Sequence, residues 1–99
     1  MITEEQAIEL YDSKFWEELT NEQIVQFQLY VDLLCMPFGV FQLAVEKCLG
    51  RSVWTHEFAF PNNLRAEFEK KVPKPSFEDI VNLIPEDKRV IILHKKNSV

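Results

Sequence analysis

Residues 20–50, TNEQIVQFQLYVDLLCMPFGVFQLAVEKCLG, decide the fold because they contain two helix patterns separated by one proline. Thr20 and Gln23 have the spacing of a capping box, which predicts a helix over about residues 21–35. Its apolar residues form two faces: Ile24, Phe27, Val31 and Leu34, and then Val25, Leu29 and Leu33. A helix that is apolar on most sides is either the buried centre of a fold or part of an oligomer interface.

A proline ends this helix and begins the next one. The residue before a proline is pushed out of the helical region, so the first helix should end at Met36. Pro37 suits the first turn of the following helix, and Gly50 is a ready C-cap for it. The inner apolar stripe of this helix is expected to be Phe38, Phe41, Val45 and Cys48. The short connection predicts an αα corner or hairpin.

The remaining chain predicts three more helices and two strands. Thr3 and Gln6 form another capping box at the start of a first helix, and apolar periodicity predicts helices over 62–72 and 76–84. Alternating side chains indicate a strand over residues 51–60: Trp54, His56, Phe58 and Phe60 point one way, and Val53, Thr55, Glu57 and Ala59 the other. Residues 90–94 are a short apolar run, which indicates a second strand. We therefore expect one domain over residues 1–99, of the helix-rich α+β class, with about five short helices and a small two-stranded sheet.

The numbers of Gly, Cys and His residues argue against most catalytic and cofactor sites. Two glycines cannot build a glycine-rich phosphate loop. Two Cys and two His are few for a zinc site, and His56-Glu57 lacks the second histidine that a zincin motif needs at position 60. We expect no catalytic residues, no metal, no cofactor and no enzyme activity. The acidic N-terminus is unlike a signal peptide, and no apolar run approaches the roughly 18–20 residues of a membrane helix.

The charge is unevenly distributed. The net charge is −5, but residues 1–32 hold eight acids and one lysine (−7), whereas residues 33–99 hold ten bases and eight acids (+2). Such asymmetry can mark a partner surface. The expected partner-binding residues are Glu4, Glu5, Glu9, Glu17, Glu18 and Glu22, with Trp16 as an aromatic anchor. The partner should be a protein with a basic surface, and nucleic acid is not expected, because phosphate binding rests on Lys and Arg.

Large aromatic residues are numerous for a small core. The chain has eight Phe, two Trp and two Tyr. Aromatic residues are favoured in the cores of protein interfaces, so an oligomer or a partner surface is also expected.

Three segments resemble a family of small phage and prophage proteins that is a domain of unknown function. They are LCMPFGVF (34–41) with AVE (44–46), LGRSVWTHEF (49–58) and LIPEDKRVI (83–91). The resemblance carries over no catalytic or binding residue. It implies a viral accessory protein in the cytoplasm of a bacterial host cell, where such proteins often bind a host protein.

Three functions follow as hypotheses. The leading one is a non-enzymatic, phage-encoded accessory protein that binds and inhibits a host macromolecule, such as a component of CRISPR or another defence system. The alternative is a small helix-turn-helix-like DNA-binding regulator with Lys47 and Arg51 near the groove. The third is an oligomeric sponge for a small molecule such as a nucleotide, bound between subunits.

Overall fold

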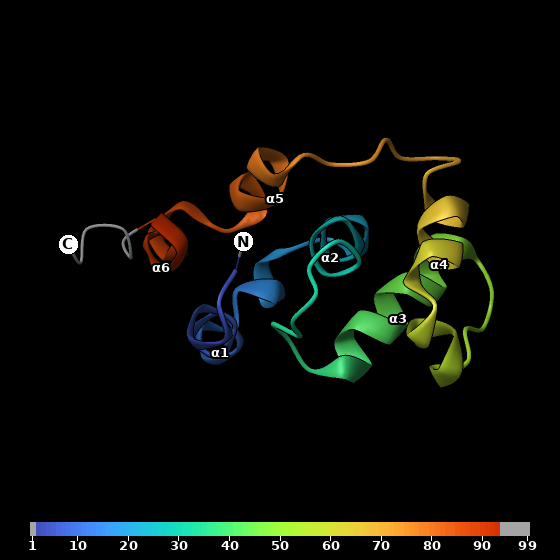
Figure 1. Ribbon diagram of the computed structural model, residues 1–99, viewed down its shortest axis with the longest axis horizontal. Helices are drawn as coiled ribbons and strands as arrows, with labels where there is room; N and C mark the ends of the chain where they lie inside the picture. The colour runs from blue at the N-terminus through green and yellow to red at the C-terminus, as the bar shows by residue number, and fades with distance from the viewer. Residues whose placement is uncertain (1, 94–99) are drawn as a thin grey trace.

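The computed structural model describes residues 2–93 (Figure 1). Within that range, four longer helices have the bounds α1 (Glu4–Ser13), α2 (Asn21–Gln28), α3 (Phe38–Leu49) and α4 (Pro61–Phe68). Two shorter ones follow as α5 (Phe77–Leu83) and α6 (Val90–Leu93), and 3-10 turns stand at η1 (Phe15–Glu18), η2 (Thr55–Ala59) and η3 (Glu86–Lys88). Over this part of the chain, no helix is both long and apolar enough to cross a membrane.

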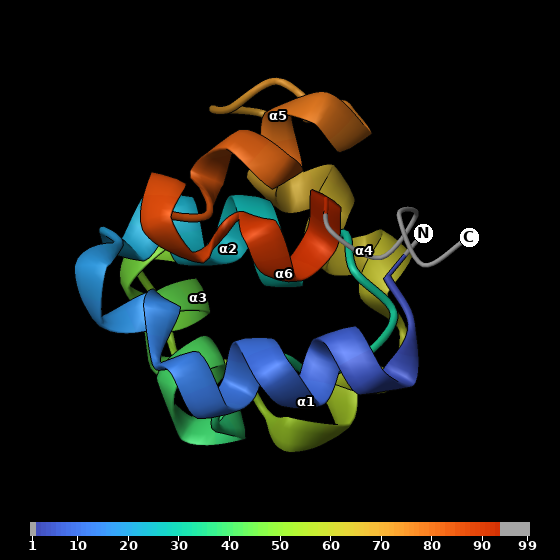
Figure 2. The ribbon, with the colours of Figure 1, turned by 90° about the vertical axis from the view of Figure 1, so that its left-hand side faces the viewer.

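The helices gather around α2 (Figure 1). α2 packs most extensively on α3 and also contacts α5, while α3 contacts α4. α1 and α6, from opposite ends of the chain, pack on each other (Figure 2). The two apolar faces of α2 are accounted for in this way, because Ile24, Val25 and Phe27 are all buried. α2 is thus the buried centre of the fold.

The two predicted capping boxes are confirmed, whereas the helix expected over 62–72 begins at Pro61 and ends at Phe68. Thr3 accepts the N–H of Gln6 at 3.1 Å, and the Gln6 side chain accepts the N–H of Thr3 at 2.8 Å. The same reciprocal pair forms between Thr20 and Gln23. Gly50 ends α3 in the left-handed region, with φ 72°, as its C-cap role predicted.

The predicted α+β class is wrong, because residues 2–93 contain helices and no strand. Residues 51–60 form a connector that includes η2, and Trp54, His56 and Phe60 are exposed rather than facing a core. The Glu57 carboxylate accepts the N–H of Trp54 at 2.9 Å. That contact caps the start of η2, which is a 3-10 turn. Because the segment is a turn and not a strand, the alternation of its side chains does not reflect burial on one side.

The second predicted strand is also wrong. Without a partner strand, an extended segment would leave its backbone groups unpaired, whereas a helix pairs them internally. Val90–Leu93 is the helix α6, and position 94 lies outside the described residues. The Gln6 side-chain amide donates to the carbonyl of Ile92 at 3.3 Å, which ties α6 to α1.

The predicted tight turn between the two central helices is also wrong. α2 ends at Gln28 instead of residue 35, and residues 29–37 form an irregular connection to α3. The buried amide of Gln28 organises this connection: its nitrogen donates to the carbonyls of Val31 (3.3 Å) and Leu33 (2.9 Å), and its oxygen accepts the N–H of Cys35 (2.8 Å). One side chain therefore satisfies three backbone groups of the connection.

Candidate functional site

The six predicted carboxylates all lie on the surface. We call them the acidic face: Glu4, Glu5 and Glu9 on α1, Glu17 and Glu18 on η1, and Glu22 in the first turn of α2. η1 follows directly after α1 (Figure 2). Within residues 2–93, the only member with an ion pair is Glu18, which lies 2.8 Å from the Lys88 ammonium. This hydrogen bond from Lys88 to Glu18 raises the pKa of Lys88.

Trp16, the predicted aromatic anchor, is packed inside the protein. It is 8% exposed and meets Tyr11 and Phe15 edge-on, with ring centroids 5.6 and 6.1 Å away. A ring this buried presents little area to a partner. Among the described residues, the exposed aromatic rings are instead Trp54 (70%), Phe60 (62%), Phe77 (44%) and Tyr11 (41%).

An aromatic pocket of about 220 Å³ opens between α3, η2, α4 and the connection after α2. Three rings pack edge-to-face within it: Phe58 lies 4.9 Å from Phe38 and 5.1 Å from Phe41 between centroids. Its other lining residues are Gln28, Leu29, Val31, Asp32, Leu34, Pro61 and Arg65. Phe38 and Phe41 were predicted as the inner stripe of their helix, and the structure leaves part of that stripe open to this pocket.

A smaller pocket of about 90 Å³ lies beside the first. It is lined by Ile2, Tyr30, Val31, Asp32, Leu33 and Phe77. Val31 and Asp32 line both pockets, so the connection held by Gln28 stands between them. Sequence reasoning assigned residues 29–35 to a helix and missed this arrangement; the signal was a lone aspartate in the apolar run LYVDLLCM.

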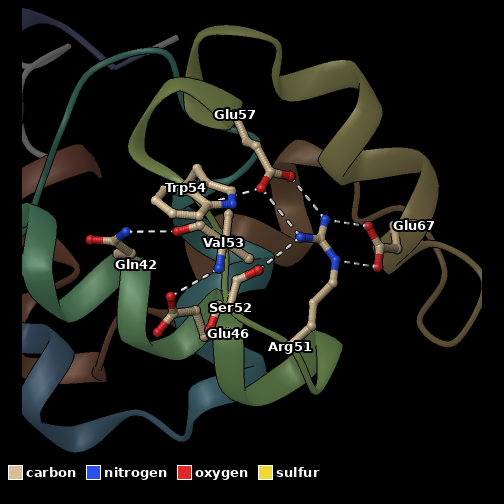
Figure 3. Close-up of polar contacts among 8 residues, drawn as sticks. All are labelled: Gln42, Glu46, Arg51, Ser52, Val53, Trp54, Glu57 and Glu67. Atoms are coloured by element: carbon tan, nitrogen blue, oxygen red, sulfur yellow. Dashed lines mark hydrogen bonds and ion pairs between the residues drawn. The ribbon is translucent and has the colours of Figure 1, made fainter.

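A polar cluster centred on Arg51 holds Glu57, the residue before Phe58 (Figure 3). The Arg51 guanidinium donates to both oxygens of Glu57 on η2 (2.9 and 3.3 Å) and to both oxygens of Glu67 on α4 (2.9 and 3.1 Å). Paired hydrogen bonds of this kind fix the relative orientation of the guanidinium and the carboxylate as well as joining opposite charges. The hydrogen bonds from Arg51 hold the pKa of Glu57 and the pKa of Glu67 below their usual range, and raise that of Arg51.

Two further bonds attach the same connector to α3. Glu46 accepts the N–H of Val53 at 2.9 Å, and Gln42 donates to the Val53 carbonyl at 2.8 Å (Figure 3). Trp54 follows directly and projects to solvent, while Phe58, three residues after Thr55, turns towards α3. The wall of the aromatic pocket is therefore held from two helices.

The residues of the DNA-binding alternative are not arranged for groove contact. A helix-turn-helix has a turn of about 3–4 residues, whereas residues 29–37 separate α2 from α3. Both cations are exposed, but Arg51 forms ion pairs with Glu57 and Glu67, so within residues 2–93 only Lys47 of the two has no ion pair.

The two cysteines behave as apolar side chains. Cys35 is fully buried, and burial raises the pKa of its thiol to about 12. Burial also raises the pKa of the half-buried Cys48. Over residues 2–93, no three His, Cys, Asp or Glu side chains gather as metal ligands would.

One family model matches the chain, and it is described as a domain of unknown function, DUF7736. The match covers residues 21–80 of the 99. The chain belongs to the DUF7736 family. No curated protein and no solved structure matches it.

The matched segment of this DUF7736 protein contains the aromatic pocket but only a small part of the acidic face. Every lining residue of the aromatic pocket and the whole Arg51 cluster lie within residues 21–80. Of the acidic face, only Glu22 does. The pocket is thus part of the family domain, whereas most of the acidic face belongs to the segment before it.

Proposed function

We propose that this DUF7736 protein is a non-enzymatic phage accessory protein that binds a host macromolecule through its acidic face. The partner has a basic surface, and a component of bacterial defence is the class we expect. The site of action is the host cytoplasm. The phage origin rests on the resemblance of residues 34–41, 49–58 and 83–91 to small phage proteins.

The observation that carries the proposal is the exposure of the six carboxylates. Five of them have no ion pair within residues 2–93, so their charge is available to a partner. Like charges along one surface repel each other slightly, and a basic partner relieves that repulsion while it accelerates encounter. The binding should therefore weaken as salt is added.

One argument for self-association does not hold. The second apolar face of the central helix was one reason to expect an oligomer, but Val25 and Leu29 are buried within the chain. Among the described residues, the exposed apolar side chains that a second copy could cover include Trp54, Phe60 and Ile8.

Affinity capture from host lysate with charge-reversed variants tests the proposal. Glu9→Lys combined with Glu17→Lys reduces the formal charge of the acidic face from −6 to −2 and keeps the Glu18–Lys88 ion pair. Glu78→Lys combined with Glu86→Lys is the matched control, since it changes the net charge equally at exposed positions outside the face. We expect the first variant to lose the captured partner and the second to retain it. Equal capture by both variants would contradict the acidic face as the binding surface.

A further inference from the structure

The aromatic pocket and the smaller pocket share two lining residues, Val31 and Asp32, and we treat the two pockets together as one surface. Asp32 lines both cavities, which have volumes of about 220 and 90 Å³. Leu34 at the edge of the first is 45% exposed, and Phe77 at the edge of the second is 44% exposed. The surface is therefore apolar on both sides of one acidic residue.

The surface carries one anionic residue, Asp32, and one cationic residue, Arg65. Asp32 is exposed and has no hydrogen bond or ion pair within the described part of the chain. The other charged lining residue, Arg65, is already engaged: it donates to the Leu29 carbonyl at 2.8 Å and to Asn62 at 3.1 Å, and it lies over the Tyr30 ring at 5.4 Å. An occupant would meet a free carboxylate and a guanidinium fixed in place.

The acidic face begins next to this surface. Ile2 lines the smaller pocket, and Glu4 and Glu5 open α1 directly afterwards. The Cα atoms of Ile2 and Glu4 can be no more than about 7 Å apart, given the reach of the chain. At the smaller pocket, which Arg65 does not line, a cationic occupant is thus favoured by Asp32 and by the start of α1.

The surface is also formed before anything binds. The three hydrogen bonds of Gln28 hold residues 31–35, and the Arg51 cluster holds Glu57, the residue before Phe58. A surface that is already ordered loses less entropy on binding than one that must be ordered.

We infer that this surface binds a short protein segment in which a lysine or arginine is flanked by apolar side chains. The basic residue pairs with Asp32, an aromatic side chain enters the larger pocket, and a smaller apolar side chain enters the other. At about 220 Å³ the larger pocket lies below the roughly 300–1,000 Å³ of sites for drug-sized ligands, so its volume suits one side chain. The inference rests on the proposed function only in taking the ligand to be a protein.

Titration of the ¹⁵N-labelled full chain with peptides tests the inference. The probe is the blocked peptide Trp-Ser-Lys-Ser-Leu, in which alternate residues share one face when extended. Trp-Ser-Glu-Ser-Leu is the matched control. We expect the lysine peptide, at up to about 5 mM, to shift the amide signals of residues 29–34 and of Phe38 and Phe58, and to bind more tightly than the glutamate peptide.

Two variants separate the charge from the apolar contact. Asp32→Asn should weaken the lysine peptide by about two- to fivefold, as for an exposed ion pair, and should remove the preference over the glutamate peptide. Leu34→Ala should weaken both peptides, while Leu43→Ala, on the exposed side of α3, should change neither. Equal binding of the two peptides by the wild-type chain, or shifts confined to other residues, would overturn the inference. If the lysine peptide binds here while Glu9→Lys/Glu17→Lys still captures the partner, the acidic face is not the surface that binds the partner. The inference about the surface around Asp32 then still holds.

Discussion

The side-chain oxygen of Gln28 accepts the backbone N–H of Cys35 at 2.8 Å, seven positions further along the chain. The nitrogen of the same amide donates to the carbonyls of Val31 and Leu33. Gln28 is 4% exposed, so these bonds are shielded from water. This one amide determines where α2 ends and how the wall between the two pockets is built.

Replacement of this amide should loosen that wall. Gln28→Leu keeps the approximate size of the side chain but leaves the N–H of Cys35 and two carbonyls without their partner. We expect the free energy of unfolding to fall by about 1–3 kcal/mol for each group that stays buried and unpaired, as measured by urea denaturation. Gln26→Leu, on the same helix, is the control and should have a small effect. A Gln28→Leu protein as stable as the wild type would show that the amide does not hold the connection.

The two tryptophans should report opposite environments. Trp16 is 8% exposed and Trp54 is 70% exposed. In Trp54→Phe the remaining indole is buried, so its emission should lie at shorter wavelength and acrylamide should quench it weakly. Trp16→Phe leaves the exposed indole, which should be quenched strongly. Equal quenching in the two single-tryptophan proteins would place Trp16 at the surface, as the sequence had suggested.

The Arg51 cluster should make stability depend on pH. Hydrogen bonds from Arg51 lower the pKa values of Glu57 and Glu67 in the folded protein below their ordinary value of 4.5. Their stabilising contribution is fully present above that value and is lost as the pH falls through the lowered folded pKa values. Arg51→Met should therefore lower the Tm at pH 7, and the difference from wild type should shrink below pH 4.5.

Lys47→Met is the matched control for this titration, because Lys47 is an exposed cation of α3 with no ion pair within residues 2–93. It should leave the Tm nearly unchanged at both pH values. A Tm difference for Arg51→Met that stays constant down to pH 3 would contradict the ion pairs.

The cysteines should differ in reactivity. The thiolate is the reactive form, and burial raises the pKa of Cys35 to about 12. In native protein at pH 8, a disulfide reagent should therefore label Cys48 in Cys35→Ser faster than it labels Cys35 in Cys48→Ser. In denaturant the two rates should become similar. Faster native labelling of Cys35 would mean that the connection after α2 opens readily.

Local signals predicted much of the helical framework. The capping boxes at Thr3 and Thr20, and Gly50 as a C-cap, depend on residues a few positions apart, so their spacing is visible in the chain. The end of α2 was not predictable in this way. The partners of Gln28 are backbone groups, which every residue has, so no side-chain pattern records the contact.

The strand prediction for residues 51–60 failed because alternation was taken for one-sided burial. Trp54 and Phe60 have the spacing of a strand face, yet both are exposed, and the start of η2 is set by Glu57 and Arg51. The candidate site was foreseen only in part. Phe38 and Phe41 were expected on an inner face, but Phe58 reaches them through a connector whose path depends on contacts with Glu46 and Glu67.

The central claim is that a basic partner lies on the acidic face and on the adjoining surface around Asp32. Hydrogen–deuterium exchange of the protein alone and in complex with the host protein that it captures tests this most directly. We predict slower exchange in α1, η1 and residues 29–41, and unchanged exchange in α5 beyond Phe77. Protection confined to α5 or to the Trp54 side of the connector, or the absence of any complex, would contradict the account.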